Sequence, residues 1–159
     1  MLYMNTDNLD YLLQRIEAHI DNYTIVNPLV SKGSVSWHID HSLKVINIVF
    51  EALQKSDPKT YENNFSLMGR IFFAIGIFPR GKAKAPKYVK PPEVILKGDL
   101  ISQIELAKTN INMISSLDQN AYFKHPLFGN VNRKRVLRFF ALHTNHHLKI
   151  INEITSSIN

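Results

Sequence analysis

The sequence predicts an all-α protein, a four-helix bundle with a long proline-rich crossover between its second and third main helices. Two observations lead to this prediction. Four segments repeat apolar residues at helical spacing, and no segment of useful length alternates apolar with polar residues as a half-buried strand does. The 159 residues, 45% of them hydrophobic, suffice for one core, so we expect a single helical domain over residues 1–159.

The first helix is expected over residues 8–22, where apolar residues recur at spacings of three and four. These residues are Leu9, Leu12, Leu13, Ile16 and Ile20. A second helix follows a turn-rich stretch, with Ser34 or Ser36 as its N-cap and its end near Lys55, before Pro58. Its repeating side holds Trp37, His41, Val45, Ile48 and Ala52.

The second half of the chain contains the other two main helices. Residues 61–78 are apolar but poorly periodic, so we expect a short helix or an irregular buried connection there. The third main helix is expected over 99–117, with Leu100, Ile104, Ala107, Ile111 and Ile114 on one side. The fourth is expected over 131–156, after an opening at Gly129-Asn130 or at Asn132.

Positive charge is concentrated in the crossover, residues 79–97. The whole chain has a formal net charge of +6, and this segment alone contributes +5 from six cations and one glutamate. The cations are Arg80, Lys82, Lys84, Lys87, Lys90 and Lys97. We expect a solvated loop that forms no core, because its prolines interrupt a helix and its cations resist burial. A more specific alternative is that the segment forms a cationic lid that attracts an anionic substrate. Nucleic-acid binding ranks third, because Tyr88 is the one aromatic residue in the segment.

Several classes of protein are excluded by composition. No apolar run approaches the 18 residues that a membrane-spanning helix needs. The N-terminus lacks a basic region followed by an apolar stretch and a small-residue cleavage site, so we expect no export signal and a cytoplasmic location. The sequence contains no cysteine, which excludes disulfides, thiolate metal ligands and a cysteine nucleophile.

Three histidines occupy apolar faces of the predicted helices. The inward seam of the last helix consists of Val136, Phe140, His143, His147, Ile150 and Ile154. His41 lies in the corresponding stripe of the second helix. A buried imidazole without a hydrogen-bond partner costs about 1–3 kcal/mol, so three of them need a common partner. A divalent metal satisfies all three, and three histidines plus water is the composition of an open catalytic zinc site.

Other interpretations of the histidines remain open at this stage. An isolated H-x-x-x-H pair arises often from helical spacing, and the H-E-x-x-H signature of metalloproteases is absent. The histidines can instead be core residues with satisfied hydrogen bonds. If the helix phase is shifted, His38 or His146 replaces one of the three as a ligand. The positions of His19 and His125 give no indication of a ligand role. Asp40, next to His41, should point elsewhere and is not expected to act as a general base.

The histidine motifs resemble a known superfamily. The segments SWHIDHSLKVI and LHTNHHLKII are similar to those of the DinB/YfiT-like superfamily of bacterial four-helix bundles. The segments APKYVKPPE and HPLFGNVNRKRVLRFFALHTNHHLKIINEI resemble a domain-of-unknown-function branch of it. The resemblance covers residues 10–154 and is strongest over 123–154. The basic run Arg133-Lys134-Arg135 departs from the acidic or aromatic turn that relatives often have, which puts a shared partner surface in doubt.

The resemblance implies a zinc or nickel site with His41, His143 and His147 as ligands. It also implies a metal-dependent hydrolase or an S-transferase that uses a small thiol such as bacillithiol, mycothiol or glutathione. The alternative is a non-catalytic metal-binding or stress-related bundle. The expected partner is a small-molecule substrate, a low-molecular-weight thiol among the candidates, with no nucleic acid and no membrane. A homodimer is one option for the assembly.

Overall fold

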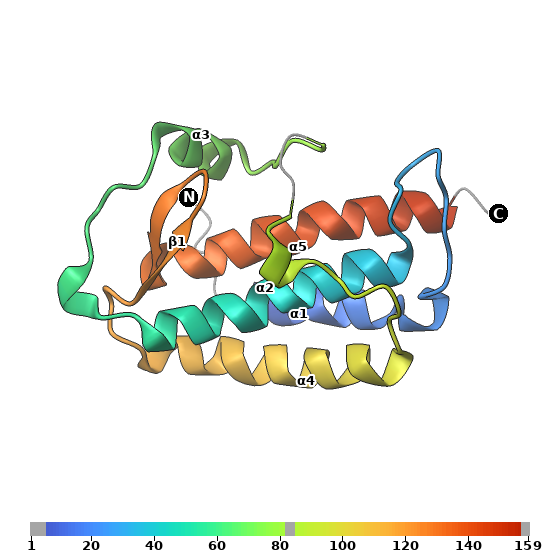
Figure 1. Cartoon of the computed structure of the whole chain (residues 1–159), viewed down its shortest axis with the longest axis horizontal. Coiled ribbons are helices and arrows are strands. Elements are labelled where there is room, and N and C mark those ends of the chain that lie inside the picture. Colours follow the sequence, from blue (N-terminus) through green and yellow to red (C-terminus); the bar gives the residue numbers. More distant parts are fainter. Residues whose placement is uncertain (1–5, 82–84, 157–159) are drawn as a thin grey trace.

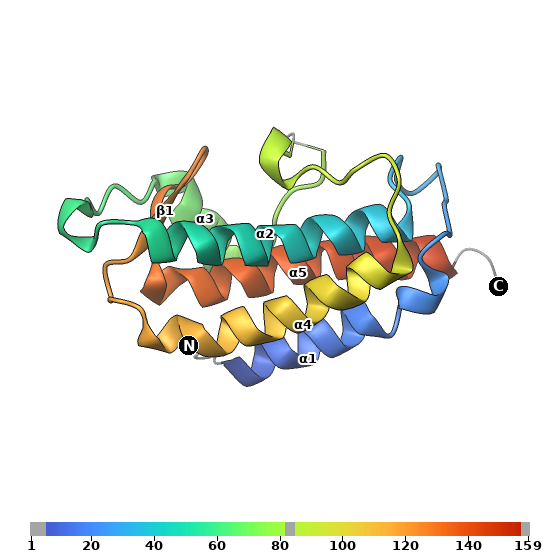
Figure 2. The ribbon, with the colours of Figure 1, turned by 60° about the horizontal axis from the view of Figure 1, so that its bottom comes forward.

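The computed structural model describes residues 6–81 and 85–156, and helices dominate this part of the chain (Figure 1). The long helices are α1 (Thr6–Glu17), α2 (Val35–Lys55), α4 (Lys97–Met113) and α5 (Arg133–Ser156). Figure 2 shows them lying side by side, and α2 and α1 each pack against both α4 and α5. A predominantly helical fold is therefore confirmed. Within the described ranges, no helix is long and apolar enough to cross a membrane.

The start of helix α2 is fixed by its N-cap residue, Ser34. The Ser34 hydroxyl accepts a hydrogen bond from the Trp37 backbone N–H at 3.1 Å, which decides between the two candidate N-caps. The face of α2 that lies deepest in the core is not the predicted stripe. It consists of Val35, Ile39, Leu43, Ile46, Phe50 and Leu53. The stripe that contains His41 is the flank of that face, and Trp37, Ile48 and Ala52 on it are only half-buried.

The prediction of no strands is wrong for one short hairpin. Strand β1 (Tyr122–His125) pairs antiparallel with β2 (Gly129–Asn132), with Phe123 opposite Val131. Gly129 has a φ of +74°, and a Cβ there would lie 2.5 Å from the Asn64 carbonyl oxygen, so this turn requires glycine. The hairpin delays the start of the last helix from the predicted residue 131 to Arg133.

The segment over 61–78 contains the short helix α3 (Leu67–Ile75). The Ser66 hydroxyl caps its start, and Gly76, with a φ of +76°, ends it. Of the two alternatives, the short helix is therefore confirmed and the irregular buried connection is not, because only Gly69 and Phe73 of α3 are buried. The helix lies over the hairpin and α5 rather than inside the four long helices (Figure 1).

The basic crossover follows α3 and passes across α2 and α5 before it reaches α4 (Figure 1). Its described cations, Arg80, Lys87, Lys90 and Lys97, are exposed as predicted, while Lys82 and Lys84 lie outside the described residues. The expectation that the segment forms no core is wrong at two positions. Val89, at the end of a short 3-10 turn (Lys87–Val89) packed on α2, is buried, and so is Pro91.

Candidate metal centre

The structure brings together three of the seven histidines, and they are the three singled out in the sequence. His41 comes from α2, and His143 and His147 come from one face of α5. One ring nitrogen from each lies within 4.8 Å of the other two, so the three can hold one metal ion. Their ring centroids form a nearly equilateral triangle, with separations of 5.1, 4.9 and 4.7 Å.

The crossover fixes the ring of His41. Its Nδ1 lies 2.8 Å from the backbone carbonyl oxygen of Val89. A carbonyl only accepts, so Nδ1 carries the proton and donates it, which leaves the lone pair of the neutral ring on Nε2. The indole of Trp37 stacks on the same imidazole at 5.2 Å and 25°. Val89 and Trp37 therefore hold His41 in one orientation with Nε2 as the free atom.

A chain of hydrogen bonds orients His147 in the same way. Its Nδ1 lies 2.9 Å from Nδ1 of His38, and Nε2 of His38 lies 2.9 Å from the Ser31 hydroxyl. If His147 binds a metal through Nε2, its Nδ1 carries a proton and donates it to His38. His38 then donates through Nε2 to the Ser31 oxygen, which also accepts from the Gly33 N–H at 3.1 Å.

His143 has no such partner. Its Nδ1 is buried, yet no group in the described residues forms a hydrogen bond with it. An unsatisfied buried polar atom costs about 1–3 kcal/mol, and native proteins contain few of them. The imidazole of His143 packs against the ring of Phe139 at 5.8 Å, which fixes its plane without satisfying its nitrogen.

Burial keeps these rings neutral. It lowers the pKa of His41, and it lowers the pKa values of His143 and His147 well below the ordinary value of 6.5. Burial also lowers the pKa of His38 to about 4. Neutral imidazoles are the form that binds metals, so the cluster offers its lone pairs at neutral pH without first losing protons.

The other candidate residues point elsewhere. His38 stands behind His147, and the His146 ring donates to the Phe78 carbonyl and lies edge-on to His147 at 5.0 Å. His19 binds Asn152 at 2.9 Å, and Nδ1 of His125 accepts two backbone N–H groups within its own hairpin turn. Asp40 faces α4, where Gln103 donates to one carboxylate oxygen and Lys44 pairs with the other.

Sequence reasoning missed the residues behind the cluster. His38 was considered only as a replacement ligand, although it lies one helical turn before His41 and next to Trp37, a spacing that places it beside the same site. No sequence signal identifies Val89, because its carbonyl reaches His41 only through the path of the crossover.

The hydrogen bond between His147 and His38 predicts a role for His38 that side-chain variants can test. We expect His38→Phe, which keeps the ring volume but has no acceptor, to weaken zinc binding by about 10–100-fold. His38→Asn keeps an acceptor near Nδ1 and should restore most of the affinity. Competition against a zinc-binding dye measures both. Equal affinities for the two variants would show that His38 only fills space.

Comparison of the chain with family models, curated proteins and solved structures finds no match. The resemblance to the DinB-like superfamily thus stays a prediction from the motifs.

Proposed function

We propose that the protein is a divalent-metal-dependent enzyme of the hydrolase or small-thiol-dependent S-transferase type, built as a DinB-like four-helix bundle. His41, His143 and His147 are its metal ligands. The three ring nitrogens, one from each histidine and all within 4.8 Å of one another, carry the proposal, and the buried Nδ1 of His143 that has no hydrogen-bond partner supports it. A bound cation explains why three neutral imidazoles lie together in a low-polarity environment.

The composition of the cluster supports a catalytic site rather than a structural one. Among the described residues, the cluster contains three histidines and no cysteine or carboxylate. Structural zinc sites are closed by four protein ligands, whereas catalytic sites use three and leave a position free. His143 is partly exposed while His41 and His147 are buried, so of the three proposed ligands His143 lies nearest to the solvent. Zinc and nickel are both among the metals that imidazole ligands suit.

The metal would supply either a bound water with a pKa near 7 or a coordinated thiolate for attack on an electrophile. The residues of this chain contribute ligand orientation and water exclusion. Val89 and His38 hold two of the ligand rings, and Trp37 covers one of them. Because the sequence contains no cysteine, any thiol must enter as a separate small molecule.

One observation favours a second candidate, a non-catalytic metal-binding or stress-related bundle. The nearest carboxylate in sequence, that of Asp40, is turned to α4, and the described residues place no carboxylate in the cluster to act as a general base. Turnover separates the two candidates. We would assay zinc-loaded protein with activated esters, and with a thiol plus an alkylating electrophile. If the protein binds zinc but turns over neither, the result supports the non-catalytic metal-binding bundle.

Metal reconstitution tests both candidates. We expect about one zinc or nickel ion per chain after dialysis, with a rise in the thermal midpoint Tm of about 5–10 °C at free zinc 100-fold above the dissociation constant. Metal analysis by mass spectrometry and a thermal melt measure these quantities. Protein that stays metal-free after exposure to both ions contradicts both candidates and leaves the histidines as core residues.

A further inference from the structure

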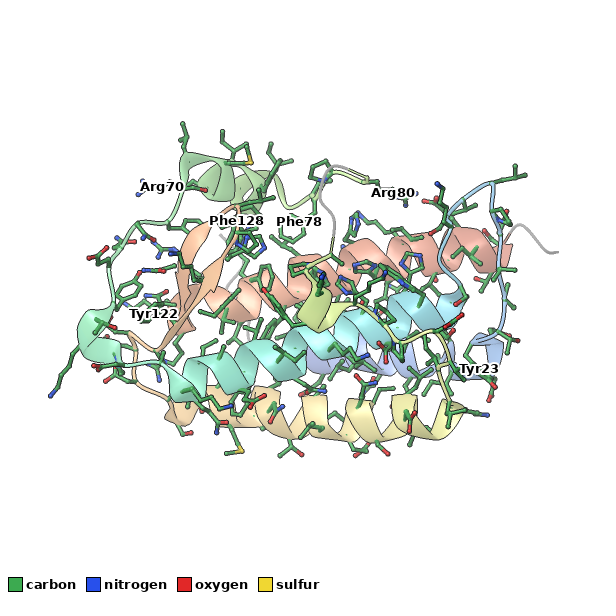
Figure 3. All side chains as sticks on the ribbon, in the orientation of Figure 1. Tyr23, Arg70, Phe78, Arg80, Tyr122 and Phe128 are labelled. Atoms are coloured by element: carbon green, nitrogen blue, oxygen red, sulfur yellow. The ribbon has the colours of Figure 1, made fainter. Side chains whose placement is uncertain are left out.

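A hollow of about 280 Å³ lies beside the histidine cluster, between α5 and the start of the crossover. The residues that matter most in its lining are Phe78, Arg80, Leu142, Asn145, His146 and Lys149. Figure 3 shows Phe78 and Arg80 on the crossover above α5, on the side of the molecule where Phe128 of the hairpin also lies. The hollow thus lies between α5 and the segment that joins α3 to the crossover.

His146 connects this hollow with the proposed metal ligands. Its side chain lines the hollow, and its ring lies edge-on to that of His147 at a centroid distance of 5.0 Å. His146 therefore borders both the hollow and the histidine cluster. A small molecule in the hollow thus contacts His146, whose ring is in turn next to His147 of the cluster.

The polar part of the lining is cationic. Arg80 and Lys149 contribute two positive charges, Asn145 adds an amide, and no carboxylate is among the lining residues. The Arg80 guanidinium is held by Glu153, whose two carboxylate oxygens accept its N–H groups at 2.7 and 2.6 Å. This pair leaves further N–H donors of the planar guanidinium available, since arginine has five.

The rest of the lining is apolar and includes Ile77, Phe78, Pro79 and Leu142. A cavity with an apolar wall and a few convergent polar groups is the usual form of a small-molecule site. Here the two charged groups of the lining, Arg80 and Lys149, are both cationic donors, which favour an anionic group on the ligand.

We propose that this hollow binds the carboxylate or phosphate group of a small organic substrate and holds the substrate against the histidine cluster. The inference rests on the proposed function for the reaction at the cluster, but the anion site itself is independent of any metal. It gives Arg80, in the basic crossover, a specific role as a binding residue, in place of a general cationic lid.

Nuclear magnetic resonance titrations of the 15N-labelled chain test this proposal. Methyl phosphate and acetate are the probes, acetamide is the neutral control, and ionic strength is held constant. We expect saturable shifts of the backbone amides of Asn145, His146 and Lys149 with one or both anions, and none with acetamide. The anion with the tighter binding assigns the group, and the same shifts should occur in metal-free and zinc-loaded protein.

Matched variants locate the site. Lys149→Gln should weaken the preferred anion about fivefold to tenfold, since one charge-assisted contact is lost. Lys134→Gln removes an equally exposed charge at the other end of α5 and should leave binding unchanged. Equal weakening by both variants, or the absence of saturable shifts, overturns the proposal.

A further outcome separates this inference from the proposed function. Shifts that occur only in zinc-loaded protein, around His41, His143 and His147, would show that the anion is a metal ligand and that the hollow is not its site. The converse outcome is a protein that binds no metal but shows the expected amide shifts, with weaker anion binding in Lys149→Gln. That outcome supports the anion site and contradicts only the proposed metal-dependent enzyme.

Discussion

Replacing His143 by alanine is expected to lower bound zinc from about one ion per chain to less than about one tenth after dialysis. Loss of a hydrogen bond behind a ligand costs roughly 10–100-fold in affinity, and loss of the ligand itself should exceed that. The same result is expected for His41→Ala and His147→Ala, since all three nitrogens converge on one point. Metal content by mass spectrometry measures the effect.

The controls come from histidines that the structure places elsewhere. His19→Ala removes a contact between the turn after α1 and Asn152 of α5, and His125→Ala removes the hairpin-turn hydrogen bonds and a ring contact with Phe139, so neither variant removes a ligand nitrogen and both should keep the metal. His146→Ala should keep it as well, because that ring faces the Phe78 carbonyl. Metal loss in His146→Ala with retention in His147→Ala would contradict the ligand assignment. Circular dichroism of the metal-free variants verifies that each one folds.

The His143 variant also separates loss of the metal from loss of the fold. The alanine removes a buried nitrogen that has no hydrogen-bond partner, so the metal-free variant loses packing but no hydrogen bond at that nitrogen. We therefore expect the metal-free melts of His143→Ala and the unchanged chain to differ less than their zinc-loaded melts. A larger difference without metal would indicate that His143 serves the core.

The long helices could be predicted because burial of one helix face leaves a regular trace in the sequence. In α5 the predicted seam is the buried face, apart from the partly exposed His143. In α2 two stripes of apolar residues compete, and the predicted one is the more polar. It contains His41 and so indicates the site, but it does not mark the core, since Ile39 and Leu43 lie deeper. Periodicity gives a helix and its faces but not their order of burial.

The hairpin and the crossover could not be predicted, for a different reason. Each strand has four residues, and polar residues such as Lys124 and Asn130 interrupt any apolar alternation. The burial of Val89 depends on where the crossover lands on α2, which no local pattern encodes. The exposure of α3 likewise depends on its position outside the long helices. These are tertiary properties, and one of them, the position of Val89, holds the ring of His41.

Acid is expected to unfold the metal-free protein well above the pH at which carboxylates titrate. Burial, the largest cause, lowers the pKa of His38 from 6.5 to about 4 in the folded state, and it lowers those of His41, His143 and His147 in the same direction. Between pH 6.5 and 4 the unfolded chain therefore binds more protons than the folded one, so stability falls as the pH falls. His38 alone accounts for about 3 kcal/mol over this window.

That loss is large beside the roughly 5–15 kcal/mol by which domains of this kind are stable. Urea unfolding of metal-free protein at several pH values measures it, and we expect a steep fall in the free energy of unfolding from pH 6.5 downward, with a flat region above pH 7.5. His38→Phe carries no titrating group at this position, so its free energy of unfolding should depend less steeply on pH between 6.5 and 4. A profile that is flat to pH 4.5 would contradict the burial of neutral histidines on which the metal site depends, because charged rings repel a cation and each other.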